Sequence, residues 1–277
     1  MFTEGIKTAL VTGASSGMGK AIAERLLKDG FQVYVAARSI DKMQDLARLG
    51  AHPLRMDVTK DDEIVAGVET ILSLTGGVDV LVNNAGFGLY GPVEEVSLEE
   101  ARYQFEVNLF GAARLTQLLL PSMRAKKAGT VVNVTSMGGK IYSVLGAWYH
   151  ATKHALEGWS DCLRLEVAEF GINVVIVEPG VIDTGFGDAA TQFFSKRSTT
   201  GPYAKLVKFI ESALKNQYAP GVGSKPSVIA DVVSRAVATR RPKTRYAAGK
   251  YAKMLIRMRL YLGDRFFDRI IMSQSQT

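Results

Sequence analysis

Four polar residues in the middle of this 277-residue chain have the types needed for proton transfer: Asn108, Ser136, Tyr149 and Lys153. Tyr149 and Lys153 are four positions apart in a stretch with helical periodicity, so both side chains should share one helix face. A free tyrosine has a pKa near ~10, and a fixed cation beside it favours the phenolate. The spacing therefore predicts an acid/base tyrosine tuned by a lysine, which is the chemistry that carbonyl reduction requires.

Each of these residues also has an ordinary structural explanation. Tyr149 could be a packed aromatic side chain and Lys153 a solvated charge on the helix surface. Ser136 could cap a helix, and Asn108 could satisfy a buried hydrogen bond. Their occurrence together is what favours a catalytic set.

A glycine-rich segment follows the first apolar run and leads directly into a helical pattern. Glycines at such a strand-to-helix turn let the backbone approach a pyrophosphate held at the helix N-terminus. On this motif alone, a glycine-rich turn without a ligand remains the alternative. The expected phosphate contacts are Gly13, Ser15, Ser16, Gly17, Met18 and Gly19.

The residue after the second predicted strand indicates which dinucleotide would bind. An acidic residue there accepts hydrogen bonds from ribose hydroxyls, whereas an arginine favours the 2′-phosphate of NADP. This chain has Arg38 and no acid at that point, and a guanidinium suits phosphate oxygens. We therefore expect NADP(H). Asp57 and Val58 end the third predicted strand, where Asp57 could bond the adenine amino group or cap the next helix.

Apolar runs of strand length alternate with longer helical stretches. The predicted strands are 8–11, 32–36, 53–56, 78–82, 130–134 and 172–177, and the predicted helices are 17–28, 41–49, 61–74, 98–124 and 147–169. Continuous apolar runs indicate strands buried on both faces of a parallel sheet. The alternation predicts an α/β, doubly wound parallel sheet of the Rossmann type, forming a single domain over residues 1–277.

Two C-terminal segments depart from this regularity. Residues 181–225 are rich in Gly, Pro, Ser, Thr and aromatic residues, which is typical of a substrate lid. A helix at 227–239, a short strand at 245–248 and a helix at 250–271 follow. Residues 240–277 form a basic extension, with ten Lys or Arg against two Asp. Tyr251, Leu255, Met258 and Leu262 make a helical stripe there, suited to packing on the body or a partner subunit, or to weak membrane-surface contact.

Composition narrows the function classes. The net charge of +7 is concentrated in the basic extension, so the rest is nearly neutral and no nucleic-acid surface is indicated. Cys162 is the only cysteine, which excludes an intrachain disulfide and a cysteine-rich zinc site, and the scattered histidines predict no metal site. No signal peptide or membrane-spanning apolar run is visible, so the expected location is the cytoplasm.

The combined motifs resemble the short-chain dehydrogenase/reductase family. The glycine segment, Asn83-Asn84-Ala85-Gly86, Asn108, Ser136, Tyr149-x3-Lys153 and Pro179-Gly180 occur in the family's order and spacing over about residues 7–184. The resemblance implies an NADP(H)-dependent oxidoreductase that interconverts an alcohol and a ketone or aldehyde. It implies that Tyr149 is the general acid/base and that Ser136 bonds the substrate oxygen. Lys153 would also hold the nicotinamide ribose, and Asn108 would order a water of the proton relay.

The resemblance extends to the remaining contacts. Further implied cofactor contacts are Asn84, Ala85, Gly86, Tyr149, Lys153, Pro179, Gly180, Val181, Ile182 and Thr184. Apolar residues expected around the site suit a bulky, lipophilic, steroid- or retinoid-like substrate: Phe87, Tyr90, Met137, Tyr142, Leu145, Trp148, Phe186, Phe193 and Phe194. Within the family, the sequence most resembles the 17β-hydroxysteroid and retinol dehydrogenase branch. A homodimer or homotetramer is implied, through the helices 98–124 and 147–169.

Two alternatives stay open. A 3-oxoacyl reductase of the same family generally lacks a C-terminal tail of this length. A non-catalytic NADP-sensing regulator usually loses a catalytic residue, whereas this chain keeps Asn108, Ser136, Tyr149 and Lys153.

Overall fold

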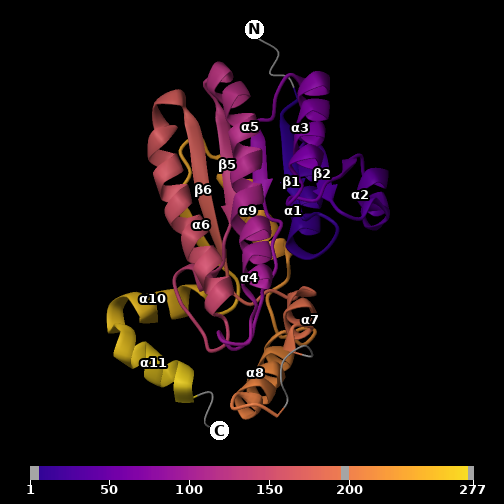
Figure 1. Cartoon of the computed structure of the whole chain (residues 1–277). Coiled ribbons are helices and arrows are strands. Elements are labelled where there is room, and N and C mark those ends of the chain that lie inside the picture. Colours follow the sequence, from indigo (N-terminus) through magenta and orange to yellow (C-terminus); the bar gives the residue numbers. More distant parts are fainter. Residues whose placement is uncertain (1–5, 195–199, 274–277) are drawn as a thin grey trace.

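The computed structural model describes residues 6–194 and 200–273. Its core is one parallel sheet of seven strands in the order β3-β2-β1-β4-β5-β6-β7 (Figure 1). The strands are β1 (Thr8–Thr12), β2 (Gln32–Ala37), β3 (His52–Arg55), β4 (Val80–Asn83), β5 (Gly129–Val134), β6 (Ile172–Pro179) and β7 (Arg245–Ala248). Each strand predicted from the sequence is present, shifted at its ends by at most two residues. The strand order reverses between β1 and β4, and such a reversal opens a crevice at the carboxyl ends of the strands.

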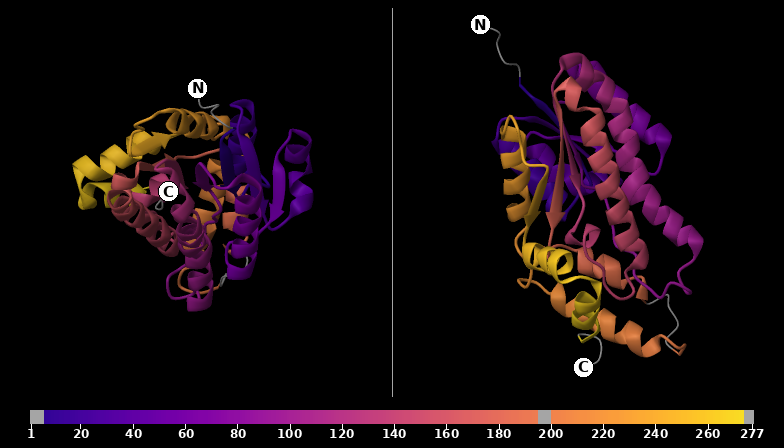
Figure 2. Two further views of the ribbon diagram at one scale, coloured as in Figure 1. Left: turned by 90° about the horizontal axis from the view of Figure 1, so that it is seen from above. Right: turned by 90° about the vertical axis from the view of Figure 1, so that its left-hand side faces the viewer.

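Helices cover both faces of the sheet, as the continuous apolar strands require. They are α1 (Gly17–Lys28), α2 (Gln44–Arg48), α3 (Asp61–Thr75), α4 (Leu98–Phe105), α5 (Gly111–Lys126), α6 (Ala147–Glu166), α7 (Phe186–Thr191), α8 (Ala204–Gln217), α9 (Ser227–Ala238), α10 (Ala252–Leu262) and α11 (Asp264–Ser273). One core layer packs α1, α2 and α9 on the sheet, and the other packs α3, α5 and α6 (Figure 2). The fold is the doubly wound α/β architecture that the sequence predicts.

Three helical stretches differ from their prediction. The predicted helix 98–124 is interrupted by a π-helical turn at Glu106–Phe110, and π turns are often found at functional sites. The predicted helix 41–49 is a 3-10 turn followed by the short α2. The predicted terminal helix breaks at Gly263, whose φ of 73° is left-handed, so it becomes α10 and α11.

The segments that depart from regularity gather at one end of the molecule. In Figure 1, α7, α8, α10 and α11 all lie at the lower end, where the carboxyl ends of the strands point. Residues 181–225 contain α7 and α8, so this expected loop-rich region also carries two helices. Within the described residues, no helix is long and apolar enough to cross a membrane.

Candidate active site

The glycine segment forms a tight cradle at the start of α1. Gly13 has a left-handed φ of 65°, and an added Cβ there would lie 2.9 Å from the Cα of Ala85. A Cβ on Gly19 would lie only 2.4 Å from the carbonyl oxygen of Gly13. Ser16 makes no side-chain cap, and the first turn of α1 has no acidic residue, so its N–H groups stay available to an anion. This arrangement fits a dinucleotide pyrophosphate.

A cleft continues from this cradle toward Arg38. It is lined by Gly13, Ser15, Ser16, Arg38, Ser39, Lys42, Asp57, Val58, Ala85 and Gly86, among others. Arg38 is exposed and donates to the Tyr103 hydroxyl at 3.3 Å. Lys42 adds a second cation to the same wall, which the sequence interpretation missed because a 3-10 turn brings it there. Arg38 and Lys42 therefore place two cations on the wall of this cleft.

Asp57 does not cap the next helix, because the N-cap residue of α3 is Lys60 and no side chain caps that helix; Asp57 instead bonds within the turn after β3. One carboxylate oxygen accepts from the Thr59 amide at 3.0 Å and from the Thr59 hydroxyl at 2.9 Å. These bonds fix the turn after β3. Asp57 still lines the cleft, so contact with an adenine group stays a prediction.

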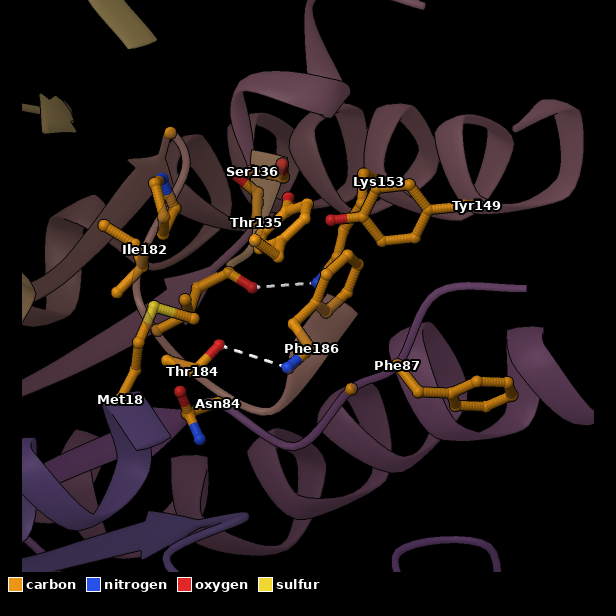
Figure 3. Close-up of a pocket in the computed structure, with 15 residues that line it drawn as sticks. Met18, Asn84, Phe87, Thr135, Ser136, Tyr149, Lys153, Ile182, Thr184 and Phe186 are labelled. Atoms are coloured by element: carbon orange, nitrogen blue, oxygen red, sulfur yellow. Dashed lines mark hydrogen bonds between the residues drawn. The ribbon is translucent and has the colours of Figure 1, made fainter. Parts of the chain in front are cut away.

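Tyr149, Ser136 and Lys153 line one pocket at the inner end of the cleft (Figure 3). Tyr149 is 7 % exposed and Lys153 is 5 % exposed, and both come from the first turns of α6. The Lys153 ammonium donates to the carbonyl of Val134 at 3.1 Å, which anchors it to the end of β5. Ser136 follows β5 directly, so the sheet and α6 together fix all three side chains.

The pKa of Tyr149 moves in the direction opposite to the sequence expectation. Burial raises it to about 12, and the hydrogen bond with Ser136 is the opposing influence. Burial also lowers the pKa of Lys153 to about 8, against the attraction of Glu157. Desolvation penalises both charged forms, so it raises the pKa of the phenol and lowers that of the ammonium. Tyr149 therefore enters the site as a protonated phenol, ready to donate a proton.

Asn108 lies in the π-helical turn and is 1 % exposed. Its side-chain amide binds the backbone of Phe87, in the chain after β4. Oδ1 accepts from the Phe87 amide at 3.0 Å, and Nδ2 donates to the Phe87 carbonyl at 3.0 Å. Nδ2 also donates to the Thr152 hydroxyl at 3.0 Å. Asn108 therefore holds the cofactor loop and α6 together, and its expected role in ordering a water stays a prediction.

A buried cluster of charged side chains forms around Glu157 of α6. Glu157, one turn after Lys153, accepts from the Thr135 hydroxyl at 2.7 Å and from Arg245 Nε at 3.0 Å. Glu178 is 4 % exposed, and burial, with the nearby Glu157 charge, raises its pKa to about 7. The cluster joins α6 to the ends of β5, β6 and β7.

The chain after β6 lines the pocket only in part. Pro179, Gly180, Ile182 and Thr184 lie on its wall, and the Thr184 hydroxyl accepts from the Phe186 amide at 3.3 Å (Figure 3). The side chain of Val181, also expected to contact the cofactor, is fully buried, and its amide donates to the Lys250 carbonyl at 3.0 Å. A contact of its backbone with a cofactor stays a prediction.

Aromatic side chains line one side of the pocket. Fewer of the apolar residues expected around the site reach its wall than the sequence indicated. Phe87 and Phe186 line the pocket, and Phe193 lines the cofactor cleft beside Phe87. Of the other expected residues, Tyr90, Leu145 and Phe194 are buried in a cluster with residues of α7 and α8, and Tyr142 packs edge-on against Phe267. Tyr218, at the end of α8, completes the pocket, and the sequence interpretation missed it because only the fold brings it there.

Comparison with known proteins agrees with this geometry. The family model described as short chain dehydrogenase matches residues 7–193. The chain belongs to the short chain dehydrogenase family. It is therefore an oxidoreductase, and its cleft fits a nicotinamide dinucleotide.

Several relatives cover nearly the whole chain. It is 34% identical over 278 residues to the NADPH-dependent 3-dehydrocapnine reductase of Ornithobacterium rhinotracheale, covering 96% of each protein. It is 33% identical over 249 residues to a 3-ketodihydrosphingosine reductase of Bacteroides thetaiotaomicron, covering 89% of each. A solved short-chain dehydrogenase from Streptomyces avermitilis superposes with a TM-score of 0.80 at 35% identity, covering 94% of this chain and 93% of the other.

Proposed function

We propose that this protein is an NADP(H)-dependent reductase of a lipophilic ketone, and that the same site can oxidise the corresponding alcohol. The observation that carries the proposal is the buried set of Tyr149, Ser136 and Lys153 at the inner end of a dinucleotide cleft. Two relatives named as reductases of keto or dehydro compounds support the direction.

Each side chain has a distinct task in the proposed reaction. Ser136 donates a hydrogen bond to the substrate carbonyl oxygen and holds it beside the Tyr149 hydroxyl. Tyr149 donates its proton to that oxygen as negative charge develops there. Lys153 stabilises the resulting phenolate and binds the nicotinamide ribose. The bound nicotinamide supplies the hydride that reduces the carbonyl carbon.

Cofactor preference rests on the cleft beyond the glycine cradle. Arg38 and Lys42 would bind the 2′-phosphate of NADP, and Gly13 and Gly19 leave room for the pyrophosphate. The name of the Ornithobacterium relative includes NADPH, which agrees with this preference. Asn84, Gly86, Pro179, Gly180, Ile182 and Thr184 would surround the nicotinamide half.

The proposed substrate is apolar because the wall opposite the catalytic pair consists of Phe87, Phe186 and Tyr218. Residues 181–225 act as the lid that supplies the last two of these rings. A long-chain ketone and a steroid-like ketone both fit an apolar wall, and the names of the two reductases favour the former.

The direct test is oxidation of NADPH and of NADH by the purified protein with long-chain, 3-oxoacyl and steroid ketones. The proposal expects turnover with NADPH, at least ~tenfold more efficient than with NADH. Cofactor binding without turnover on any ketone would instead support the regulator. Higher efficiency with NADH would refute the role of Arg38.

The C-terminal helices are proposed to cover the body. Ile256 of α10 is buried; within the predicted stripe, Leu255 and Met258 are half-buried and Tyr251 is exposed, so the stripe is covered only in part. Tyr261 and Leu262, at the junction with α11, stay exposed. Flotation with liposomes, with and without residues 250–277, tests the weak membrane contact that these residues could make. Light scattering tests the expected homodimer or homotetramer.

A further inference from the structure

Tyr218 is a phenol on the substrate side of the pocket that the proposed reaction does not use. It is the C-terminal cap of α8 and lines the pocket with Tyr149 and Phe186. Its ring centroid lies 5.3 Å from that of Phe186, which in turn lies 5.6 Å from that of Tyr149. The two phenols therefore contact the same phenylalanine ring.

The position of Tyr218 is fixed by close packing. A Cβ on Gly187 would lie 2.4 Å from the Cβ of Tyr218, so the backbone of α7 rests directly against this residue. The chain beyond α8 is tied to the chain beyond β6, since Gly221 donates to the Asp183 carboxylate at 2.9 Å and Ser224 donates to the Val181 carbonyl at 3.0 Å. Tyr218 is thus part of the wall of the pocket and is held beside the reacting groups.

The hydroxyl of Tyr218 makes no hydrogen bond to any residue that the structure describes. Burial, with a smaller influence from Tyr149, raises its pKa above the ordinary tyrosine value, so it is a hydrogen-bond donor at neutral pH. The neighbouring Tyr90 differs, because it is bonded to Ser143. A donor held in a pocket without a partner favours any ligand that brings an acceptor.

The remaining lining residues define which acceptor fits. Among the described residues of the pocket wall there is no carboxylate, so an ammonium group on the substrate would have no counter-ion. Lys153, the one cationic side chain among those described residues, acts on Tyr149 in the proposed reaction. The donor of Tyr218 thus suits an uncharged oxygen.

We propose that Tyr218 donates a hydrogen bond to a second, uncharged oxygen of the substrate, on the carbon next to the reacting carbonyl. The substrate class is then a lipophilic ketone with an adjacent hydroxyl or ether oxygen. This inference rests on the proposed ketone reduction and names the substrate class of that same site.

The experiment compares three ketones that differ in one substituent: 2-dodecanone, 1-hydroxy-2-dodecanone and 1-methoxy-2-dodecanone. The methoxy compound keeps the acceptor and lacks a donor. The wild-type protein is expected to reduce both oxygen-bearing ketones with a kcat/KM roughly ten- to hundredfold above that for 2-dodecanone. In Tyr218→Phe, the kcat/KM values of the two oxygen-bearing ketones should fall to that of 2-dodecanone, so the advantage of the added oxygen is lost.

Tyr246→Phe is the matched control, because Tyr246 lies on β7 and its hydroxyl accepts from the Lys243 amide at 3.1 Å. It should leave all three values unchanged. Equal kcat/KM for the three ketones with the wild-type protein would overturn the inference, even if Tyr218→Phe fails to fold. An equal loss on all three in Tyr218→Phe would also overturn it, since it indicates a structural role.

A binding measurement separates failure of this inference from failure of the proposed ketone reduction. Calorimetric titration of the NADPH-bound protein with 1-methoxy-2-dodecanone and 2-dodecanone measures recognition without turnover. Tighter binding of the methoxy compound, lost in Tyr218→Phe, would uphold the role of Tyr218 even if no ketone is reduced. Equal binding of the two compounds would refute it.

Discussion

The cofactor cleft and the substrate side of the pocket both end at Tyr149 and Lys153, but different kinds of contact hold them. In the cleft, main-chain segments pack directly on one another. A Cβ on Gly13 or on Gly19 would collide with neighbouring main-chain atoms. On the substrate side, the ring centroid of Phe186 lies 5.3 Å from that of Tyr218 and 5.6 Å from that of Tyr149. The first arrangement admits one ligand shape, whereas side-chain rings can be exchanged to change the substrate while the cofactor site is kept.

The largest effect is expected from a methyl group in the glycine cradle. In Gly19→Ala the Cβ would lie 2.4 Å from the Gly13 carbonyl oxygen and 2.5 Å from Asn84 Nδ2. The cradle must distort, so the affinity for NADPH should fall by about a hundredfold or more. Fluorescence titration with NADPH measures this change.

Gly158→Ala is the control for that variant. A Cβ at Gly158, within α6, meets nothing within 4 Å, so this exchange should leave NADPH affinity unchanged and slightly stabilise the helix. If Gly19→Ala binds NADPH as tightly as Gly158→Ala, the cradle does not hold the pyrophosphate.

The next effect concerns the far end of the cofactor cleft. Arg38→Ala removes a guanidinium from the wall that also carries Lys42. Loss of a charge-assisted bond to phosphate should weaken NADPH binding by roughly ten- to hundredfold and leave NADH binding nearly unchanged. Titration with both dinucleotides gives the ratio. An equal loss for both would mean that Arg38 does not distinguish them.

A smaller effect is expected on the substrate side. Phe186→Ala removes the ring that contacts both Tyr149 and Tyr218, and kcat/KM for a long-chain ketone should fall by about tenfold. NADPH affinity should stay the same. Phe266→Ala, at an exposed position of α11, is the control. A loss of NADPH affinity in Phe186→Ala would show that the two regions are not independent.

The smallest effect is a dependence on pH. The pKa of Lys153 is lowered to about 8, so its ammonium loses its proton as the pH rises through that value. Tyr149, with a pKa of about 12, stays protonated throughout. The profile of kcat/KM for ketone reduction should therefore be level up to about pH 8 and decline above it. Glu178→Gln should keep this decline, since the pKa of Glu178 is about 7. A level profile well beyond pH 8 would contradict the role of Lys153.

The two regions also differ in how far the sequence predicts them. The cradle is contiguous from Gly13 to Gly19, and the strands around it are continuous apolar runs, so fold and cofactor cleft followed from local patterns. The sequence did not indicate that Lys42 lines the cleft or that Tyr218 lines the pocket, because only the folded chain brings them there. The burial of the Val181 side chain was not foreseen either, because its neighbours Gly180 and Ile182 line the pocket and residue type alone does not separate them.

Electrostatics were harder to predict than positions. The spacing of Tyr149 and Lys153 placed both on one face of α6, as expected. It could not indicate that desolvation dominates the pKa of both groups, because burial arises only when distant segments pack around them. The same limit applies to Glu157 and Glu178, whose cluster with Arg245 joins residues far apart in the chain.

Single-turnover reduction of a long-chain ketone by the NADPH-bound Tyr149→Phe variant tests the central claim most directly. The account predicts that this variant binds NADPH with wild-type affinity and reduces the ketone at least about a hundredfold more slowly, because the proton donor is gone. Reduction at the wild-type rate would contradict the assignment of Tyr149 as the acid of this site.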